Sequence, residues 1–225
     1  MKKKNQKMIT IVHEHPRHVP VSNKNPSGST IVDQHIRHLS GSFLDRNELG
    51  KMFKNYNHDG VVFPTSQKLL SEYPKADKYD EIIAIWTDYF NKKFPANSPL
   101  DPDVVKALIA SESSFRLDPP ENPIAIGIAQ ITKKTFKIIQ DSKGEVKDFI
   151  FIKFIQKDLK DPNIAIPMAI RWLFHKKKLA KAKLGKEPTA EEIILEYKGL
   201  LKSTTKYKND ALKNFRKAYE KLKGK

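Results

Sequence analysis

Helix-start signals divide the last two thirds of this sequence into segments of helical length. Asp101 and Asp161 are each followed by a proline, and a capping aspartate with proline in the first turn is a strong signal for the start of a helix. Thr132 and Thr189 offer further caps, and residues 77–94 carry a broad apolar stripe at helical spacing. No strand–helix–strand repeat is recognisable, so we predict a mostly α-helical fold.

The sequence suggests three parts. Residues 1–29 are polar and lack sustained periodicity, which predicts a flexible tail. Residues 30–76 are predicted to form an N-terminal helical or extended segment, whose spaced apolar residues suggest that it packs on the rest of the protein. Residues 77–225 then form the main domain.

Several elements within these parts can be assigned from their patterns. We predict a helix over residues 30–39, a second helix capped by Asp45, a short helix at residues 67–72 and a final helix over residues 205–223. The apolar run at residues 146–155 is compatible with a helix or with a strand.

The chain is strongly basic, with 42 lysines and arginines against 26 aspartates and glutamates and a net charge of +16. Such a surface favours a polyanionic partner, which can be nucleic acid, an anionic membrane or an acidic polysaccharide such as cell wall. No arginine-rich segment with interleaved aromatic residues is present, so we predict no nucleic acid partner.

Cysteine and long apolar segments are both missing from the sequence, which limits the classes of protein that it can encode. The sequence has no cysteine, which excludes disulfides and thiolate metal sites. The apolar run Met8–Val12 follows a basic start but is too short for the core of a signal peptide, and no stretch is long enough to cross a membrane. We therefore expect no transmembrane segment and no classical signal peptide.

Histidines cluster near the start of the chain. His13, His15 and His18 are closely spaced in the predicted tail, and His35 and His38 lie three residues apart. No carboxylate–histidine motif accompanies them, so we predict solvated or capping histidines rather than a metal site.

Residues 55–60 resemble the first half of a calcium-binding loop, with Gly60 in the sixth position. Ser66 stands where such a loop needs a bidentate glutamate. We therefore predict a polar turn here, and no metal in the protein.

Glu112 is a carboxylate beside the apolar face of a predicted helix. It follows Leu108 by four positions and Ile109 by three, so its side chain projects next to theirs. Partial burial helps a carboxylic acid to keep its proton near neutrality, which is what a general acid needs to protonate a glycosidic oxygen. A glutamate at a helix end can equally turn into solvent, and spacing alone favours that interpretation.

Four motifs occur in a fixed order: Glu112-Ser113-Ser114-Phe115, Gly127-Ile128-Ala129-Gln130, Asp161-Pro162-Asn163-Ile164 and Tyr197-Lys198-Gly199. Together they resemble the soluble lytic transglycosylase family, whose members are related to goose-type lysozyme. The similarity extends over roughly residues 78–215. Each motif is weak alone, and their shared order makes the resemblance strong.

The resemblance implies a lysozyme-like α fold with a cleft for the glycan strand of peptidoglycan, and no cofactor. Glu112 would protonate the oxygen of the β-1,4 bond between N-acetylmuramic acid and N-acetylglucosamine. It would then act as base on the muramyl 6-hydroxyl, which closes a 1,6-anhydro ring without water or a second carboxylate. Ser113, Gly127, Gln130 and Tyr197 match family positions in the cleft, with Tyr197 touching the acid and Gly127 allowing the backbone to approach the sugar.

Two cleft positions depart from the family pattern. Ala129 stands where the family has methionine, and Lys198 stands where it has asparagine. We expect both to line the substrate-binding region, where Lys198 introduces a flexible cation in place of a neutral amide.

The sequence leaves two alternatives to the transglycosylase open. A second carboxylate that activates water would make the protein a muramidase, which hydrolyses the same bond. The carboxylates considered for this role are Glu196, Asp118, Glu121, Asp141 and Glu145. The change to Lys198 also leaves open a noncatalytic protein that binds or assembles cell wall.

Peptidoglycan lies outside the cytoplasmic membrane, although no classical signal peptide is expected here. We therefore expect the protein to act on the cell wall, in the periplasm or outside the cell, after delivery by another route. A specialised secretion apparatus or release at phage lysis would provide such a route. An inhibitor protein is a further partner to test.

Overall fold

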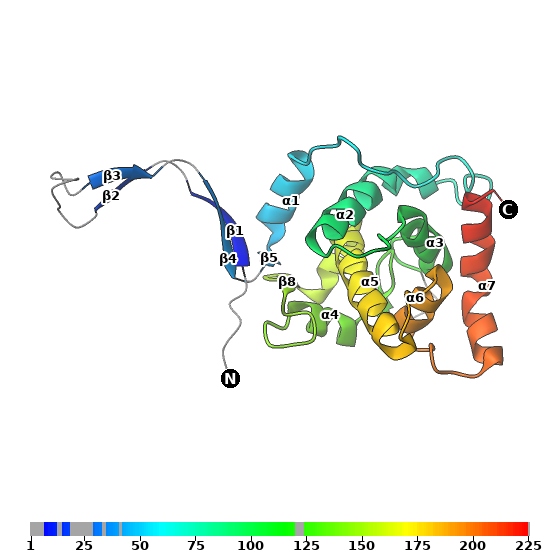
Figure 1. Ribbon diagram of the computed structural model, residues 1–225. Coiled ribbons are helices and arrows are strands. Elements are labelled where there is room, and N and C mark those ends of the chain that lie inside the picture. Colours follow the sequence, from blue (N-terminus) through cyan, green and yellow to red (C-terminus); the bar gives the residue numbers. More distant parts are fainter. Residues whose placement is uncertain are drawn as a thin grey trace.

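The computed structural model describes residues 7–12, 15–18, 29–32, 35–40, 42–119 and 124–224. Helices dominate it, with α5 in the middle of the helical body and α7 along one side (Figure 1). The α-helices are α1 (Arg46–Lys54), α2 (Asp80–Lys93), α3 (Pro102–Ser113), α4 (Lys133–Gln140), α5 (Pro162–Leu184), α6 (Ala190–Tyr197) and α7 (Thr205–Leu222). The predicted mostly α-helical fold is confirmed.

The predicted helix starts are confirmed by their caps. The Asp101 side chain accepts the Asp103 N–H at 2.9 Å, and the Asp161 side chain accepts the Asn163 N–H at 2.9 Å. Thr132 caps α4, and a capping box at Thr189 opens α6. These caps satisfy N–H groups that have no partner within the helix, so they locate each helix start from sequence alone.

The N-terminal strands correct two predictions. β1 (Lys7–Val12) pairs antiparallel with β4 (His35–Ser40), and β2 (His15–His18) pairs with β3 (Ser29–Val32). Figure 1 shows both pairs as an arm that extends from the helical body.

The helix predicted over residues 30–39 is therefore wrong, and strands also occur within the predicted tail. Residues such as Ile31, Val32 and Ile36 are β-branched and favour strands over helices, although their spacing also fits a helix. Residues 1–6, 13–14 and 19–28 of the tail lie outside the described residues, as does His13. Within the described part of the chain, no three histidines or carboxylates are grouped to hold a metal.

The N-terminal segment from Ser42 onward packs on the helical body. β5 (Ser42–Leu44) runs parallel to β8 (Phe149–Phe151), so the ambiguous apolar run at 146–155 contains a strand. α1 begins after a capping box at Asp45, as predicted. The predicted helix at residues 67–72 is wrong: the backbone forms turns, and Gln67 has a left-handed φ of 64° that is incompatible with a right-handed helix. The boundaries at residues 29 and 76 stay predictions.

A buried lysine fastens this N-terminal segment to α3. Lys106 has no exposed surface, and its Nζ donates to the Thr65 carbonyl at 2.9 Å, to Asp77 at 2.6 Å and to Asp80 at 2.9 Å. Asp77 lies in the short 3-10 helix η1 (Ala76–Tyr79) that precedes α2. A buried ammonium is tolerated only when it is paired and hydrogen-bonded, so these contacts hold the three segments in one arrangement.

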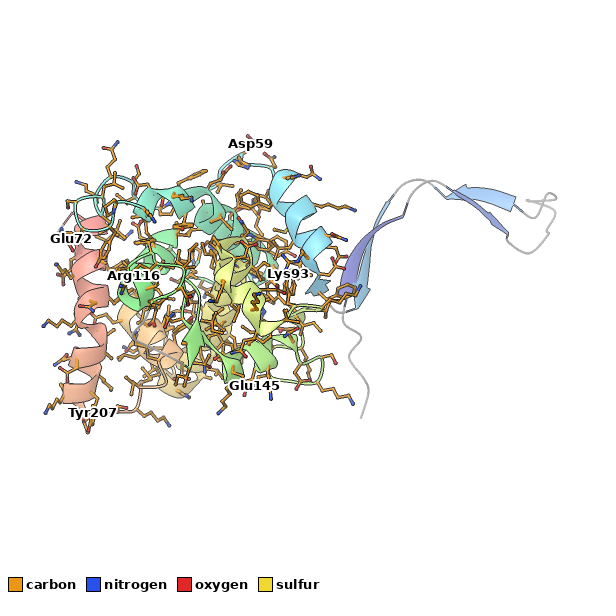
Figure 2. All side chains as sticks on the ribbon, turned by 180° about the vertical axis from the view of Figure 1, so that it is seen from behind. Asp59, Glu72, Lys93, Arg116, Glu145 and Tyr207 are labelled. Atoms are coloured by element: carbon orange, nitrogen blue, oxygen red, sulfur yellow. The ribbon has the colours of Figure 1, made fainter. Side chains whose placement is uncertain are left out.

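The outer helix α7 is held by further charges. Glu72 pairs with Lys217 at 3.0 Å and also with Lys221, and Figure 2 shows Glu72 beside α7. These pairs are partly exposed and contribute little energy individually, but they orient α7 against the N-terminal segment.

No helix within the described ranges is both long and apolar enough to span a membrane.

Candidate active site

Glu112 occupies the last turn of α3, which stops abruptly after it. Ser114 and Phe115 adopt left-handed backbone angles, with φ of 54° and 61°. Each such residue costs roughly 1–2 kcal/mol. Phe115 is 1% exposed and packs against Tyr73 and Tyr79, with ring centroids at 5.7 and 6.1 Å. Burying a phenylalanine contributes about 1.5–3 kcal/mol, which offsets much of the strain of the two residues and helps to hold Glu112 at the helix end.

The second motif forms the loop of a small hairpin between β6 (Ala125–Ile126) and β7 (Ile131–Thr132). Gly127 has a φ of 76°, and a Cβ there would lie 1.8 Å from the Leu159 carbonyl oxygen. Gln130 also has a positive φ, of 49°, and its backbone N–H and Nε2 both donate to the Gly127 carbonyl, at 3.0 and 2.9 Å. The loop is therefore held by its own backbone and by the segment that carries Leu159.

The fourth motif, Tyr197-Lys198-Gly199, places the end of α6 beside Glu112 and the hairpin loop. The Tyr197 hydroxyl donates to the Ala129 carbonyl at 3.0 Å, which joins α6 to the hairpin loop. Burial raises the pKa of Tyr197, and the nearby charge of Glu112 raises it further. The hydroxyl therefore remains a neutral donor at physiological pH.

These three segments surround a pocket of about 210 Å³. Glu112, Gln130, Tyr197 and Lys198, all predicted as site residues, line it. Four further residues line it that were not predicted as site residues: Ile131, Thr132, Thr135 and Trp172. Trp172 lies on α5, ten residues after the Asp161-Pro162 motif. The sequence predicted this helix, but it did not predict that the Trp172 side chain faces the pocket.

Lys198 and Glu112 form an ion pair within this pocket. Lys198 Nζ donates to Glu112 Oε1, and their side chains are only 20% and 15% exposed. Water screens such a pair incompletely, so the ammonium and the carboxylate attract each other more strongly than they would in solvent. Lys198, which stands where the family has asparagine, thus contacts the predicted acid Glu112 directly.

Three predicted site residues do not line the pocket. Ser113 is 3% exposed and its hydroxyl donates to the Ile109 carbonyl, while Ala129 is fully buried. Gly127 makes its close approach to Leu159 within the protein. Their contact with substrate stays a prediction.

A second carboxylate is not found in the pocket among the described residues. The described candidates outside it are Glu196, Asp118, Asp141 and Glu145. Glu196 is buried beside Lys183, whose Nζ donates to it at 2.6 Å. Glu121 lies outside the described residues. Glu112 is thus the one carboxylate that the described lining of this pocket offers for proton transfer.

Comparison with known families identifies a match over the second half of the chain. A family model described as "Transglycosylase SLT domain" matches residues 89–214, which is more than half of the 225-residue chain. All the residues that line the pocket fall within this range. No curated protein matches the chain.

Proposed function

This chain belongs to the family of transglycosylase SLT domains, and we propose that it is a peptidoglycan lytic transglycosylase with Glu112 as its single acid and base. The bond cleaved is the β-1,4 bond between N-acetylmuramic acid and N-acetylglucosamine. The observation that carries this proposal is the position of Glu112, which is alone among carboxylates in the described lining of the pocket.

The reaction needs only one carboxyl group, because Glu112 gives up a proton in the first step and receives another in the second. Glu112 in its acid form gives a proton to the bridging oxygen, and the bond from that oxygen to the muramyl C1 breaks. The muramyl 6-hydroxyl then gives its proton to the Glu112 carboxylate while its oxygen bonds to C1. The products are a free N-acetylglucosamine 4-hydroxyl and a 1,6-anhydro ring, and no water is consumed.

Gln130 and Tyr197 are suited to hold the sugar and the acid in place. Gln130 is held by its two bonds to Gly127, and the Tyr197 hydroxyl is held by the Ala129 carbonyl. Side chains fixed in this way lose little freedom when a substrate binds, which lowers the entropic part of the barrier.

The Glu112–Lys198 pair supports a second candidate function. While the Lys198 ammonium contacts Glu112 Oε1, that oxygen is not free to meet a glycosidic oxygen. A protein in which substrate never separates them would bind cell wall without cutting it. Retention on purified sacculi without release of fragments would favour this second function.

The experiment that tests the proposal is mass spectrometry of the fragments released from purified sacculi by the wild type and by Glu112→Gln. The expected products are anhydro-muropeptides from the wild type and none from the variant. Reducing-end fragments, one water heavier, would instead identify a muramidase. No release by a folded wild-type protein would contradict both enzymatic readings.

Delivery to the cell wall by a route without a classical signal peptide is part of the same proposal. It can be tested by following the protein in cells whose general export pathway is blocked. Continued appearance outside the cytoplasmic membrane is expected, through a secretion apparatus or at lysis. Export that stops with the block would contradict it.

A further inference from the structure

Lys198 supplies the one positive charge in the described lining of the pocket at Glu112. This lining consists of one cation, one carboxylate and six neutral residues: Lys198, Glu112, Gln130, Ile131, Thr132, Thr135, Trp172 and Tyr197. Lys198 pairs with Glu112, so the two charges compensate each other. A ligand that brings a further charge into the pocket therefore has to change this pairing.

The backbone of Lys198 is fixed by the end of α6. Its N–H donates to the Ile194 carbonyl at 2.9 Å, and the Gly199 N–H donates to the Glu196 carbonyl at 3.1 Å. Gly199 has a φ of 73°, in the left-handed region in which helices commonly end. The Lys198 side chain is thus attached at a well-held point beside the pocket.

The side chain of Lys198 is held by one partner in the described part of the chain. Its Nζ donates to Glu112 Oε1, and its stem of four methylene groups is flexible. The side chain is 20% exposed, so solvent and solutes reach it. The ammonium can therefore turn to another anion while its backbone stays in place.

Lys176 is a second cation close to this pocket, but its contacts lie elsewhere. Its ammonium is 4.4 Å from the centre of the Trp172 ring and 3.9 Å from Glu196 Oε1. Neither Lys176 nor Glu196 belongs to the described lining of the pocket. Lys198 is therefore the cation of the described residues that a charged group inside the pocket meets directly.

The muramyl sugar of peptidoglycan carries a charged group of this kind in one of its two forms. Its lactyl group ends in a neutral amide where a stem peptide is attached, and in a free carboxylate where the peptide has been removed. This group belongs to the sugar ring whose bond to oxygen breaks in the proposed reaction, so it enters the pocket with that bond. The nearest carboxylate of an attached peptide lies on its second residue, and each extended residue adds about 3.3–3.6 Å.

We propose that Lys198 makes the protein selective for peptide-free glycan strands, because the free lactyl carboxylate draws the Lys198 ammonium away from Glu112. This inference rests on the proposed function. The ammonium exchanges one charge-assisted hydrogen bond for another, and Glu112 Oε1 becomes free to meet the glycosidic oxygen. The lactyl amide of a peptide-bearing strand is neutral and a weaker partner, so the Glu112–Lys198 pair persists. The substrate is then supplied by a reaction that hydrolyses the amide bond between the lactyl group and the peptide.

Cleavage of three matched glycan strands tests the proposal. The first carries stem peptides, the second has been stripped of them by an amidase, and the third is a stripped strand whose lactyl carboxylates are converted to carboxamides. We expect the wild type to cleave the stripped strand with a kcat/KM about tenfold higher than either of the others, because it alone offers the lactyl carboxylate. The carboxamide strand separates the effect of charge from that of removing a bulky peptide.

The Lys198→Asn variant should cleave the three strands with similar kcat/KM. Two controls should keep the preference for the stripped strand: Lys202→Asn, at an exposed position beyond α6, and Lys176→Gln, which removes the cation over Trp172. Equal cleavage of the stripped and carboxamide strands by the wild type would overturn the proposal. A preference that survives in Lys198→Asn, or that is lost equally in Lys176→Gln, would also overturn it.

Binding without cleavage distinguishes a failure of this proposal from a failure of the proposed function. In the Glu112→Gln variant the carboxylate partner is gone, so Lys198 is available to the lactyl carboxylate. In calorimetric titrations of this folded variant, we expect the stripped strand to bind about tenfold more tightly than the carboxamide strand. Adding Lys198→Asn should abolish the difference.

Equal binding of these two strands to Glu112→Gln would overturn the proposed role of Lys198, whether or not the wild type cleaves glycan. Release of anhydro-muropeptides from all three strands at equal rates would overturn the selectivity and leave the transglycosylase intact. Release from none of them would contradict the transglycosylase, and the titration would still decide whether Lys198 recognises the lactyl carboxylate.

Discussion

Lys198 sets the charge that surrounds the proposed catalytic acid. Its ammonium meets Glu112 inside a pocket where both side chains are mostly buried. A hydrogen bond between charged groups contributes about 1.5–3 kcal/mol, less where solvent reaches one partner. This contact is present in the free enzyme and has to be broken before Glu112 can meet the glycosidic oxygen, so it adds to the barrier.

Replacing Lys198 with asparagine should therefore speed the reaction. We expect Lys198→Asn to raise kcat on purified sacculi by about tenfold, which corresponds to about 1.4 kcal/mol of barrier. Initial rates of fragment release measure this. Lys202→Asn, an exposed position beyond the end of α6, is the control and should leave kcat unchanged. A lower rate in Lys198→Asn would show that the ammonium assists the substrate instead.

Gly127 offers a test of what the second motif does within the protein. A Cβ there would lie 1.8 Å from the Leu159 oxygen, while a Cβ at Gly60 would meet nothing within 4 Å. The two glycines have nearly equal φ angles, 76° and 73°. A comparison of Gly127→Ala with Gly60→Ala therefore separates the steric clash from the backbone strain.

We expect Gly60→Ala to lower the free energy of unfolding by about 1 kcal/mol, from the left-handed backbone alone. Gly127→Ala should lower it by about 3 kcal/mol or more, because the hairpin loop or the Leu159 segment has to shift. Urea denaturation measures both. Equal losses of unfolding free energy in the two variants would mean that the Leu159 segment moves aside at little cost.

At the scale of the element, α5 contributes side chains to two pockets. Trp172 lines the pocket at Glu112, and His175 lines a second pocket of about 490 Å³ next to the end of α2. Burial lowers the pKa of His175, and its contact with Glu145 only partly opposes this. The folded protein therefore binds a proton at His175 more weakly than the unfolded chain does.

The sign of the resulting pH dependence follows from proton binding. The unfolded chain protonates His175 near pH 6.5, whereas the folded chain protonates it at lower pH. The contribution of His175 to stability is therefore fully present above about pH 6.5 and is lost as the pH falls towards the folded pKa. We expect the wild type to lose more stability than His175→Gln between pH 7.5 and pH 5.5 in urea denaturation. Parallel losses in the two proteins would contradict the lowered pKa.

At the scale of the whole molecule, the N-terminal segment from Leu44 is part of the helical body. Leu44, Leu49 and Leu69 are 7%, 5% and 0% exposed within the main core. The family match begins only at residue 89, although these leucines pack on the helices that it covers. A fully buried leucine contributes about 1.5–3 kcal/mol.

Two truncations test this integration. Deletion of residues 1–41 should change the free energy of unfolding by less than about 1 kcal/mol, since the core of the described residues begins at Leu44. Deletion of residues 1–76 should remove several kcal/mol, because it removes three buried leucines and the Thr65 contact to Lys106. Denaturation curves compare the two chains. Equal stability would mean that the segment is dispensable.

Local signals predicted much of the helical body. Caps such as Asp101 and Asp161 act within two or three residues, so they are visible in the sequence and located the helices. Residues 30–39 were assigned wrongly because their β-branched residues also fit helical spacing, and strand pairing over a distance decided the outcome.

The site was only partly predictable for the same reason. Glu112, Gln130 and Tyr197 were identified through motifs, and the structure brings them to one pocket. The ion pair between Glu112 and Lys198 joins residues 86 positions apart, and no local pattern announces it. Trp172 was missed because helical spacing does not say which neighbour a large side chain faces.

The first turn of α3 also has a topological consequence. The Asp103 carboxylate accepts the Thr65 N–H at 2.7 Å and Lys223 Nζ at 2.7 Å. An early segment and the last helix of the body thus meet at one side chain. A circular permutant that joins the last residue to residue 42 by a linker long enough to cross the helical body, with new ends in the exposed turn at residues 141–143, would keep these contacts. The pocket at Glu112 should survive this rearrangement, because it depends on which segments touch and not on the order in which a ribosome makes them.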